Sequence, residues 1–302
     1  MLVFSFYEVR SNVMLLQLTK YLPNSKKMRK ETTKWCLLLV CLFTGLLSCK
    51  KDKAEIKSEN GQVKAWETLI DGNSFASYAN FEAQWNYNYP WGTDHNGSAR
   101  MVGSSSNHNQ ISLSGSVLTI KATRLTTSPG NSTANGFTNV AIWYNSGACH
   151  AKQQVLINDQ FPSYTISGDF AVPTSKGTWP AFWITGVNSW PPESDIMEFK
   201  GNNTNWQNTY DGGWENKLTA VSNAGSYHNY KCWYNKVSAT DVDCHYYIDN
   251  VWVAKHTMSN SVNKPMWLII NMQMEGDSGA PGPSGNTLYT GKNIYLGRER
   301  AF

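Results

Sequence analysis

The chain has 302 residues, of which 13% are aromatic and only 16% charged, and this composition excludes an intrinsically disordered protein because it can bury a large apolar core. The formal net charge is +4, but residues 1–49 hold seven of the 26 basic and two of the 22 acidic residues, so the remaining 19 basic and 20 acidic residues give −1. The main part of the chain therefore has no excess of basic residues, and we expect no nucleic-acid partner.

The first predicted element is a leader over 1–48. Residues 28–34 are basic and residues 35–47 form an apolar run, which is typical of a secretory signal peptide and too short for a stable membrane span. Residues 1–27 precede this signal, and we interpret them as a start-site artefact. The end of the signal resembles a bacterial lipobox, so Cys49 is the expected lipidation site and would anchor the protein to a bacterial membrane, on the periplasmic or cell-surface side. An ordinary signal peptide is the alternative.

A charged segment without aromatic residues follows, and we expect 49–63 to be a lipidated cysteine and a flexible tether. The globular domain is predicted over 64–302, and we expect it to be a monomer. It shows no useful amphipathic helical window but has short alternating runs between segments rich in Gly, Asn, Ser and Pro. These runs are 116–123, 140–144, 151–157, 164–172, 195–200, 217–222, 230–235, 242–248, 266–273 and 293–297. They predict an all-β fold, an antiparallel sandwich or barrel.

Three cysteines remain in the domain: Cys149, Cys232 and Cys244. Their spacing matches no metal-binding motif such as C-x-x-C. Cys232 and Cys244 lie on two consecutive predicted strands, and they would be opposite each other across a hairpin centred near Ser238. An oxidising compartment would allow a disulfide there, and a pair of buried thiols is the alternative.

An acidic cluster lies in the middle of the domain. Only Asp159 and Asp169 are acidic between positions 101 and 192, and then Glu193, Asp195 and Glu198 fall within six positions. In a regular strand alternate residues share a face, so Glu193 and Asp195 would point to one side and Glu198 to the other. A β-bulge that absorbs one residue between Asp195 and Glu198 would return Glu198 to the side of the other two.

Two carboxyl groups that face one cleft are what a retaining glycosidase requires, with a nucleophile and an acid/base group about 5–5.5 Å apart. Asp195 between them could orient Glu193 and help to raise the pKa of Glu198. A solvent-facing acidic strand and a calcium site are the alternatives, and the strand-forming Ile196 and Met197 argue against the flexible loop that calcium favours. We expect no cofactor, with a structural calcium ion left open.

Two motifs lie close together around this cluster: Gly177-Thr-Trp-Pro-Ala-Phe-Trp183 and Trp190-Pro-Pro-Glu193-Ser-Asp195-Ile-Met-Glu198. At this spacing they resemble glycoside hydrolase family 16. The resemblance implies a β-jelly-roll sandwich of the concanavalin A-like type, with two curved antiparallel sheets and an open concave cleft for a polysaccharide chain. It also implies a retaining endo-acting hydrolase.

Residue by residue, the resemblance implies that Glu193 is the nucleophile, Asp195 its helper and Glu198 the acid/base. The extra residue between Asp195 and Glu198 resembles the bulged branch of the family, which includes laminarinases, agarases, porphyranases and carrageenases. Trp179 and Trp190 match tryptophans of the family near the cleavage subsites, where an indole face packs on a sugar ring.

The sequence departs from the family pattern at two places. Pro192 stands where many laminarinases have Gly, and the segment around Asn96 replaces the usual Asn-Glu-x-Gln pattern. Asn96 and Arg100 in that segment are therefore candidate sugar contacts without a safe family equivalent. Trp206 and Gln207 follow the catalytic strand and are further candidates, on the product side.

The distribution of arginine bears on the substrate. No Arg occurs from Leu125 to Gly297, whereas a sulfated galactan would call for cationic pockets. We therefore expect a neutral β-1,3- or β-1,3/1,4-glucan, with an agarase- or porphyranase-like endo-β-galactanase as the alternative. A non-catalytic surface glycan-binding protein on the same fold is the second alternative, and the presence of all three carboxylates favours the enzyme.

Overall fold

The computed structural model describes residues 56–57 and 63–301. The predicted leader and Cys49 lie outside the described residues, so export and lipidation stay predictions. Within the predicted tether, Ile56–Lys57 forms a short strand, β1, which pairs with the start of β2 (Val63–Ile70). No helix in the described part of the chain combines the length and the hydropathy needed to cross a bilayer.

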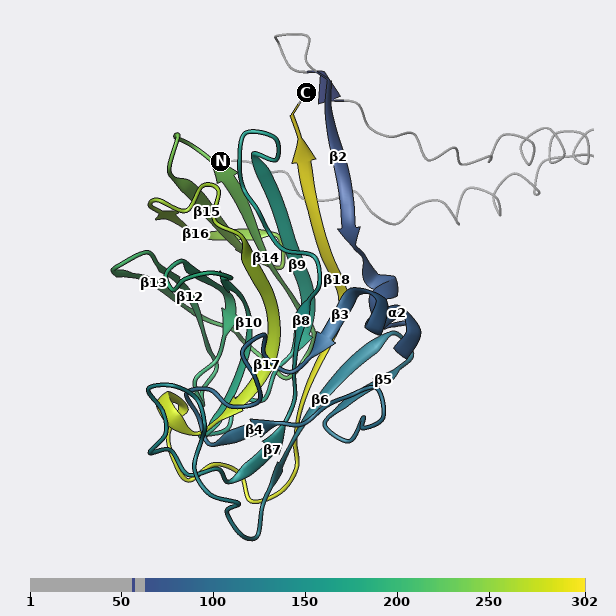
Figure 1. Cartoon of the computed structure of the whole chain (residues 1–302), viewed down its shortest axis with the longest axis vertical. Coiled ribbons are helices and arrows are strands. Elements are labelled where there is room, and N and C mark those ends of the chain that lie inside the picture. Colours follow the sequence, from purple (N-terminus) through teal and green to yellow (C-terminus); the bar gives the residue numbers. More distant parts are fainter. Residues whose placement is uncertain (1–55, 58–62, 302) are drawn as a thin grey trace, which may run out of the picture. The chain divides into compact units, whose positions relative to one another are not determined.

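Two curved sheets, almost wholly antiparallel, make up the domain and confirm the predicted all-β sandwich (Figure 1). The larger sheet has the strand order β16-β15-β14-β9-β18-β6-β7-β4, with β2 on β18 and β5 on β6. Besides β1 and β2, its strands are β4 (Ala99–Met101), β5 (Ile111–Ser114), β6 (Val117–Arg124), β7 (Tyr144–Ser146), β9 (Ser163–Ala171), β14 (His228–Lys236), β15 (Val242–Ile248), β16 (Val251–Met258) and β18 (Thr287–Arg300).

The smaller sheet has the strand order β13-β12-β11-β10-β17-β8-β3. Its strands are β3 (Trp85–Tyr87), β8 (Ala148–Ala151), β10 (Thr178–Gly186), β11 (Glu193–Glu198), β12 (Thr204–Tyr210), β13 (Trp214–Ala220) and β17 (Met266–Met274). Helical structure in the described residues is limited to α2 (Tyr78–Gln84) and two 3-10 turns, Gly72–Phe75 and Gly276–Ser278. The side chain of Ser77 caps α2 by accepting a hydrogen bond from the backbone N–H of Asn80.

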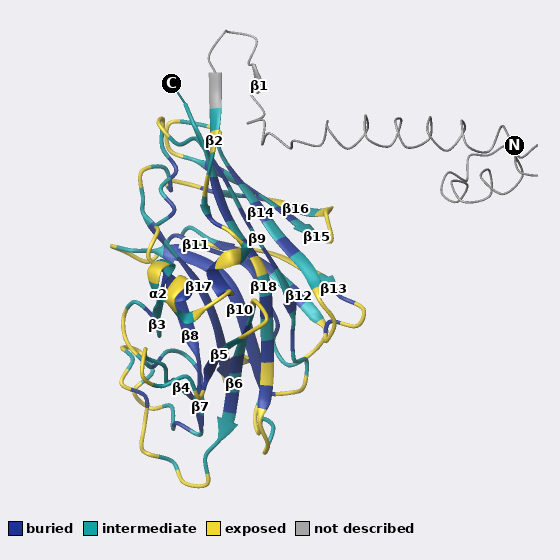
Figure 2. Ribbon diagram, turned by 90° about the vertical axis from the view of Figure 1, so that its right-hand side faces the viewer, coloured by how far each residue is buried: buried dark blue, intermediate teal, exposed yellow. Residues whose placement is uncertain are grey.

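The core lies between the two sheets, and the strands that enclose it are the most deeply buried segments (Figure 2). Phe170 of β9 reaches across to Phe182 of β10, with ring centroids 4.9 Å apart, and also packs on Tyr289. Gly291 is paired with Phe170 on the adjacent strand, and a Cβ there would come within 2.6 Å of the phenyl ring. Glycine at this position therefore leaves the space that the ring occupies.

Two of the predicted strands agree closely with the structure. The range 242–248 coincides with β15, and 266–273 with all but the last residue of β17. The ranges 140–144 and 151–157 were wrong, because most of their residues are irregular. The backbone N–H groups of Ile142 and Trp143, for example, bond the carbonyls of Gly130 and Ser98 instead of a neighbouring strand.

The cysteine pair differs from the disulfide that the sequence allowed. The β14–β15 hairpin is centred on Ala239, one residue later than expected, which places Tyr246 opposite Cys232 and Cys244 opposite Tyr234. The two cysteines are therefore diagonal neighbours on one face of the hairpin. Both are buried free thiols, which was the alternative expectation.

We expect Phe170→Ala to lower the free energy of unfolding by about 3–5 kcal/mol, because it removes a fully buried ring that joins the two sheets. Val251→Ala is the control: Val251 is 65% exposed, and a change within about 0.5 kcal/mol is expected. Chemical denaturation of the two variants measures the difference. A loss below about 1 kcal/mol for Phe170→Ala would contradict the assigned packing.

Candidate active site

The smaller sheet carries a cleft of about 780 Å³ on its face away from the larger sheet. Strands β10 to β13 form its floor, and the loops 91–96, 137 and 186–190 form its sides. The lining side chains of the floor are Trp179, Trp183, Thr185, Glu193, Asp195, Glu198, Trp206, Asn208, Trp214 and Asn216. The sequence-predicted acidic cluster and most of the predicted tryptophans therefore meet in one place.

The pairing of β11 with β10 contains the predicted β-bulge. Met197 is opposite Phe182 and Asp195 is opposite Trp183, so Ile196 has no partner of its own and the register shifts there. One residue of β11 is thus taken out of the alternation.

The bulge brings the three carboxylates to the same side of the strand. Glu193, Asp195 and Glu198 all line the cleft. Ser194 and Met197 point to the opposite side, and neither is exposed to solvent. The hydroxyl of Ser194 lies 3.0 Å from that of Tyr234 and forms a further hydrogen bond with Tyr246, so β11 is also hydrogen-bonded on its core side.

Glu193 is held by an indole. Nε1 of Trp190 donates to Oε2 of Glu193 at 2.9 Å, and the Trp190 ring stacks on Tyr210, with centroids 4.3 Å apart and planes 13° from parallel. Tyr210 stands opposite Glu193 on β12. Trp190 itself is 56% exposed, so one aromatic side chain both orients the carboxylate and offers surface to a ligand.

Glu198 and Asp195 share a donor. Nδ2 of Asn208 donates to Oε2 of Glu198 at 2.7 Å and to Oδ2 of Asp195 at 2.9 Å, while Nε1 of Trp179 donates to Oε1 of Glu198 at 2.6 Å. The expected partner of Asp195 was Glu193, but the hydrogen bond of Asp195 connects it through Asn208 to Glu198. Neutral donors of this kind satisfy buried carboxylates without adding positive charge.

Burial and mutual repulsion shift the protonation of the cluster. Burial raises the pKa of Glu193 to about 7, with a further contribution from the charge of Glu198 and opposition from the Trp190 hydrogen bond. Burial and the charges of Glu198 and Glu193 raise the pKa of Asp195 well above its ordinary value. Burial also raises the pKa of Glu198, which Lys200 and the Trp179 hydrogen bond oppose. Carboxyl groups with raised pKa values can carry protons in mildly acidic to neutral solution.

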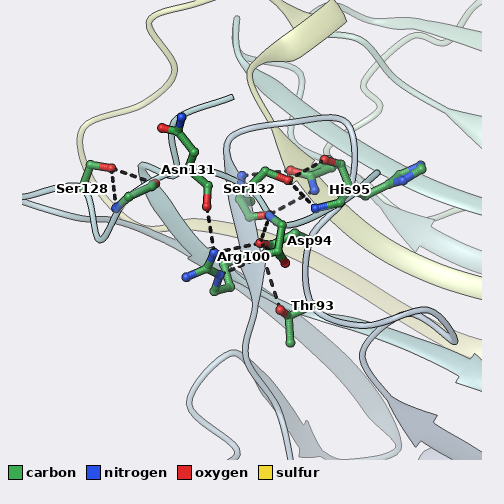
Figure 3. A network of polar contacts seen from close by, with 12 residues as sticks. Thr93, Asp94, His95, Arg100, Ser128, Asn131 and Ser132 are labelled. Carbon is green, nitrogen blue, oxygen red and sulfur yellow. Dashed lines mark hydrogen bonds and ion pairs between the residues drawn. The ribbon is translucent and has the colours of Figure 1, made fainter. Parts of the chain in front are cut away.

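Arg100 is not among the residues that line the cleft, although the sequence made it a candidate sugar contact. Its guanidinium forms a bidentate pair with Asp94, with Nε–Oδ1 and Nη2–Oδ2 distances of 2.8 and 2.7 Å, and also donates to the carbonyl of Asn131 (Figure 3). Asp94 accepts two more bonds from Thr133, from its backbone N–H and its hydroxyl. Arg100 therefore binds two loops of the protein to each other instead of a ligand.

This ion pair determines where one end of the cleft lies. Asp94 has a side chain that is 1% exposed; burial alone would raise its pKa, but the bonds from Arg100 and Thr133 outweigh burial and keep it low. It is followed directly by His95 and Asn96, which both line the cleft. Fixing Asp94 between two loops thus fixes the two residues that reach the ligand space.

Aromatic side chains gather at that end. His95 stacks on Trp183 with centroids 6.1 Å apart, and it contacts Trp91 at 5.2 Å and Phe137 at 5.9 Å. Burial lowers the pKa of His95 to about 4, so the imidazole is neutral near pH 7. Trp183 lies at the junction of core and cleft, since it packs in the core cluster and also lines the cleft.

Of the remaining candidates, Trp206 lines the cleft and Gln207 does not. The two are neighbours on β12, and alternation points the Gln207 side chain away from the cleft, where its Oε1 accepts from Thr219 at 3.0 Å. Strand alternation therefore places Trp206 in the cleft and Gln207 outside it.

Sequence reasoning missed Asn208, Lys200 and His95. Asn208 shares the Trp206 face of β12, so strand alternation could have identified it once β12 was recognised. Lys200 follows Glu198 by two residues and could have been found as the cation nearest the cluster in sequence. The role of His95 depends on loop packing and left no sequence signal.

Glycoside hydrolases are among the known proteins to which the chain is similar. No protein-family model matches the chain. A galactan endo-β-1,3-galactanase from Flammulina velutipes is 43% identical over 234 residues, which are 76% of this chain and 90% of that protein. Among solved structures, an endo-1,3-β-glucanase from Streptomyces sioyaensis matches with a TM-score of 0.58 and 17% identity, over 77% of this chain and 96% of that one.

A second structure, a non-specific endo-β-1,3(4)-glucanase of family GH16, matches with a TM-score of 0.57 and 13% identity, over 77% of this chain and 94% of that chain. At such low identity the two solved structures show only that the fold is shared, a jelly roll of two curved sheets. The galactanase is similar at 43% identity over most of both chains, and this similarity shows the family. The chain therefore belongs to the endo-acting β-glycan hydrolases of glycoside hydrolase family 16.

Proposed function

We propose that the protein is a retaining endo-β-1,3-galactanase in which Glu193 is the nucleophile and Glu198 the acid/base. The observation that carries the mechanism is the bulge at Ile196, because it puts both glutamates on the floor of one aromatic cleft. A carboxylate that attacks and a carboxylic acid that protonates, side by side, are the requirement for retention of configuration.

In the first step, a carboxylate oxygen of Glu193 bonds to the anomeric carbon while the bond to the leaving oxygen breaks. Glu198 gives its proton to that oxygen, so the leaving sugar departs as an alcohol and Glu198 becomes a carboxylate. In the second step, Glu198 takes a proton from water as the water oxygen bonds to the anomeric carbon, and Glu193 is released. Asp195 adds negative charge beside both glutamates and favours retention of a proton within the cluster.

The substrate assignment rests on the galactanase relative, which is named for action on a β-1,3-linked galactan. The glucan that the sequence favoured has support from structural neighbours of at most 22% identity, and at that identity such neighbours show the fold alone. The galactan alternative therefore takes precedence over the glucan. Indole and phenyl surfaces along the cleft suit the apolar faces of neutral sugar rings.

The charges of the cleft also favour a neutral chain. The single cationic side chain among the described lining residues is Lys200, and carboxylates already lie beside it: Glu198 at 3.4 Å and Asp277 at 3.8 Å. Recognition of sulfate groups would need cations with unpaired donors, preferably arginine. Arg100 does not supply them, because it does not line the cleft and its Nε and Nη2 donate to Asp94 and Asn131.

We expect the purified protein to cleave unsubstituted β-1,3-galactan internally and to release a series of short oligosaccharides. Laminarin, mixed-linkage β-glucan and agarose serve as matched substrates, and product sizing over time distinguishes internal from terminal attack. A kcat/KM for laminarin above that for β-1,3-galactan would contradict the substrate assignment. It would leave the roles of the two glutamates in place.

We expect Glu193→Gln and Glu198→Gln each to lower kcat by about 10²–10⁴-fold. The first variant removes the group that bonds to the anomeric carbon, and the second removes the group that gives and takes the proton. Oligosaccharide binding, measured by calorimetry, should stay within a few-fold of wild type. Glu215→Gln is the matched control, since Glu215 is exposed on β13 and does not line the cleft. Near-normal turnover in either active-site variant refutes the assigned roles.

A further inference from the structure

Lys200 lies inside the cleft, two residues after Glu198. Its Nζ is 3.4 Å from Oε2 of Glu198 and 3.8 Å from Oδ2 of Asp277, on the 3-10 turn after β17. The ammonium group also lies over the indole rings of Trp206 and Trp179, 4.9 and 5.5 Å from their centroids. The side chain is only 20% exposed.

In this position the charge of Lys200 is screened by water less than the charge of a surface lysine. An ammonium group between two indoles has less water around it, so its field at a carboxylate 3.4 Å away is screened less than it would be in bulk solvent. The contact with Glu198 is short and enclosed, whereas Asp277 is 73% exposed and so interacts weakly.

The other charges that face this cation are few. Glu193, Asp195 and Glu198 come from β11 and Asp277 from the turn. His95, the remaining basic side chain among the described lining residues, is neutral near pH 7, since burial lowers its pKa to about 4. Lys200 is therefore the one positive charge set against a cluster of three carboxyl groups within the described cleft.

We propose that Lys200 is a positioning residue that sets the acidity of Glu198, by stabilising the carboxylate left behind when Glu198 gives its proton to the departing sugar. This inference rests on the proposed role of Glu198 as acid/base. The proton moves to the glycosidic oxygen as the C–O bond breaks, and the negative charge that appears on Glu198 forms next to a fixed ammonium group. No reorganisation is needed at that moment, which is the condition under which such a charge accelerates a reaction.

The consequence is a particular pH dependence. The basic limb of kcat/KM reports loss of the proton that the cluster must donate, and a neighbouring cation moves that loss to lower pH. Lys200 also opposes the raised pKa of Glu193, but there it is the smallest of the contributions, whereas at Glu198 it is the strongest opposing one. Removing the charge of Lys200 should therefore shift the basic limb of kcat/KM to higher pH, and by more than it shifts the acidic limb.

The test is the pH profile of kcat/KM for Lys200→Met and Lys200→Gln, measured on whichever polysaccharide the wild-type enzyme cleaves. We expect both neutral variants to move the basic limb up by about one pH unit. Lys200→Arg keeps the positive charge, so its basic limb should stay at close to the wild-type pH. Two different neutral variants are used so that a folding defect in one does not decide the outcome.

An unchanged basic limb in a folded neutral variant, together with an inactive Glu198→Gln variant, overturns this inference and leaves the proposed function standing. An active Glu198→Gln variant overturns both. A purely structural role for Lys200 predicts a lower melting temperature and a higher KM with both limbs at their wild-type pH, which is a different result from the one expected.

Discussion

Three carboxylates within six residues of one strand can face the same cleft only if the strand loses its alternation at one point. In this protein that point is Ile196, where β11 contains a residue without a partner on β10. The bulge turns Glu198 into the cleft beside Glu193 and Asp195, and it turns Met197 into the core. Without it, the pair of glutamates required for the chemistry would lie on opposite sides of the sheet.

The rest of the site compensates for bringing these negative charges together. Trp190, Trp179 and Asn208 donate hydrogen bonds to the cluster, and Lys200 supplies one positive charge at its edge. These groups oppose the raised pKa values that burial imposes but do not remove them. The site is therefore able to keep a proton available while it holds the carboxyl groups in fixed positions, which is the balance that acid/base catalysis needs.

Some features of the cleft could be predicted from the sequence. The spacing of Glu193, Asp195 and Glu198 predicted that one residue of the strand is bulged. Trp179 and Trp190 were predicted from the family resemblance and Trp206 from its place after the acidic strand, and all three line the cleft. Strands β10 and β12 were not predicted. β10 is buried on both faces, by the core and by the cleft, and so shows no alternation.

Other features depended on contacts that spacing does not report. Arg100 looked like a ligand contact because nothing in the sequence indicates that Asp94, six positions earlier, would bind it at close range. The sequence left a disulfide and a pair of buried thiols open for Cys232 and Cys244, because it does not fix the centre of the hairpin, and a shift of one residue changes which side chains are opposite each other. The ring contacts of His95 with Trp91, Phe137 and Trp183 could not be predicted either, because they depend on how the loops pack. The general fold and the acidic cluster of the cleft could thus be predicted, while the groups that hydrogen-bond to the cluster required the structure.

The central claim is that Glu193 and Glu198 act on one sugar from the same cleft, with Glu193 bonded to it for part of the cycle. Proton NMR of the first products tests this most directly, because it distinguishes the two anomers of a newly formed reducing end before mutarotation mixes them. A retaining mechanism predicts that the β-anomer appears first. Initial release of the α-anomer would show single displacement by water and would contradict the claim.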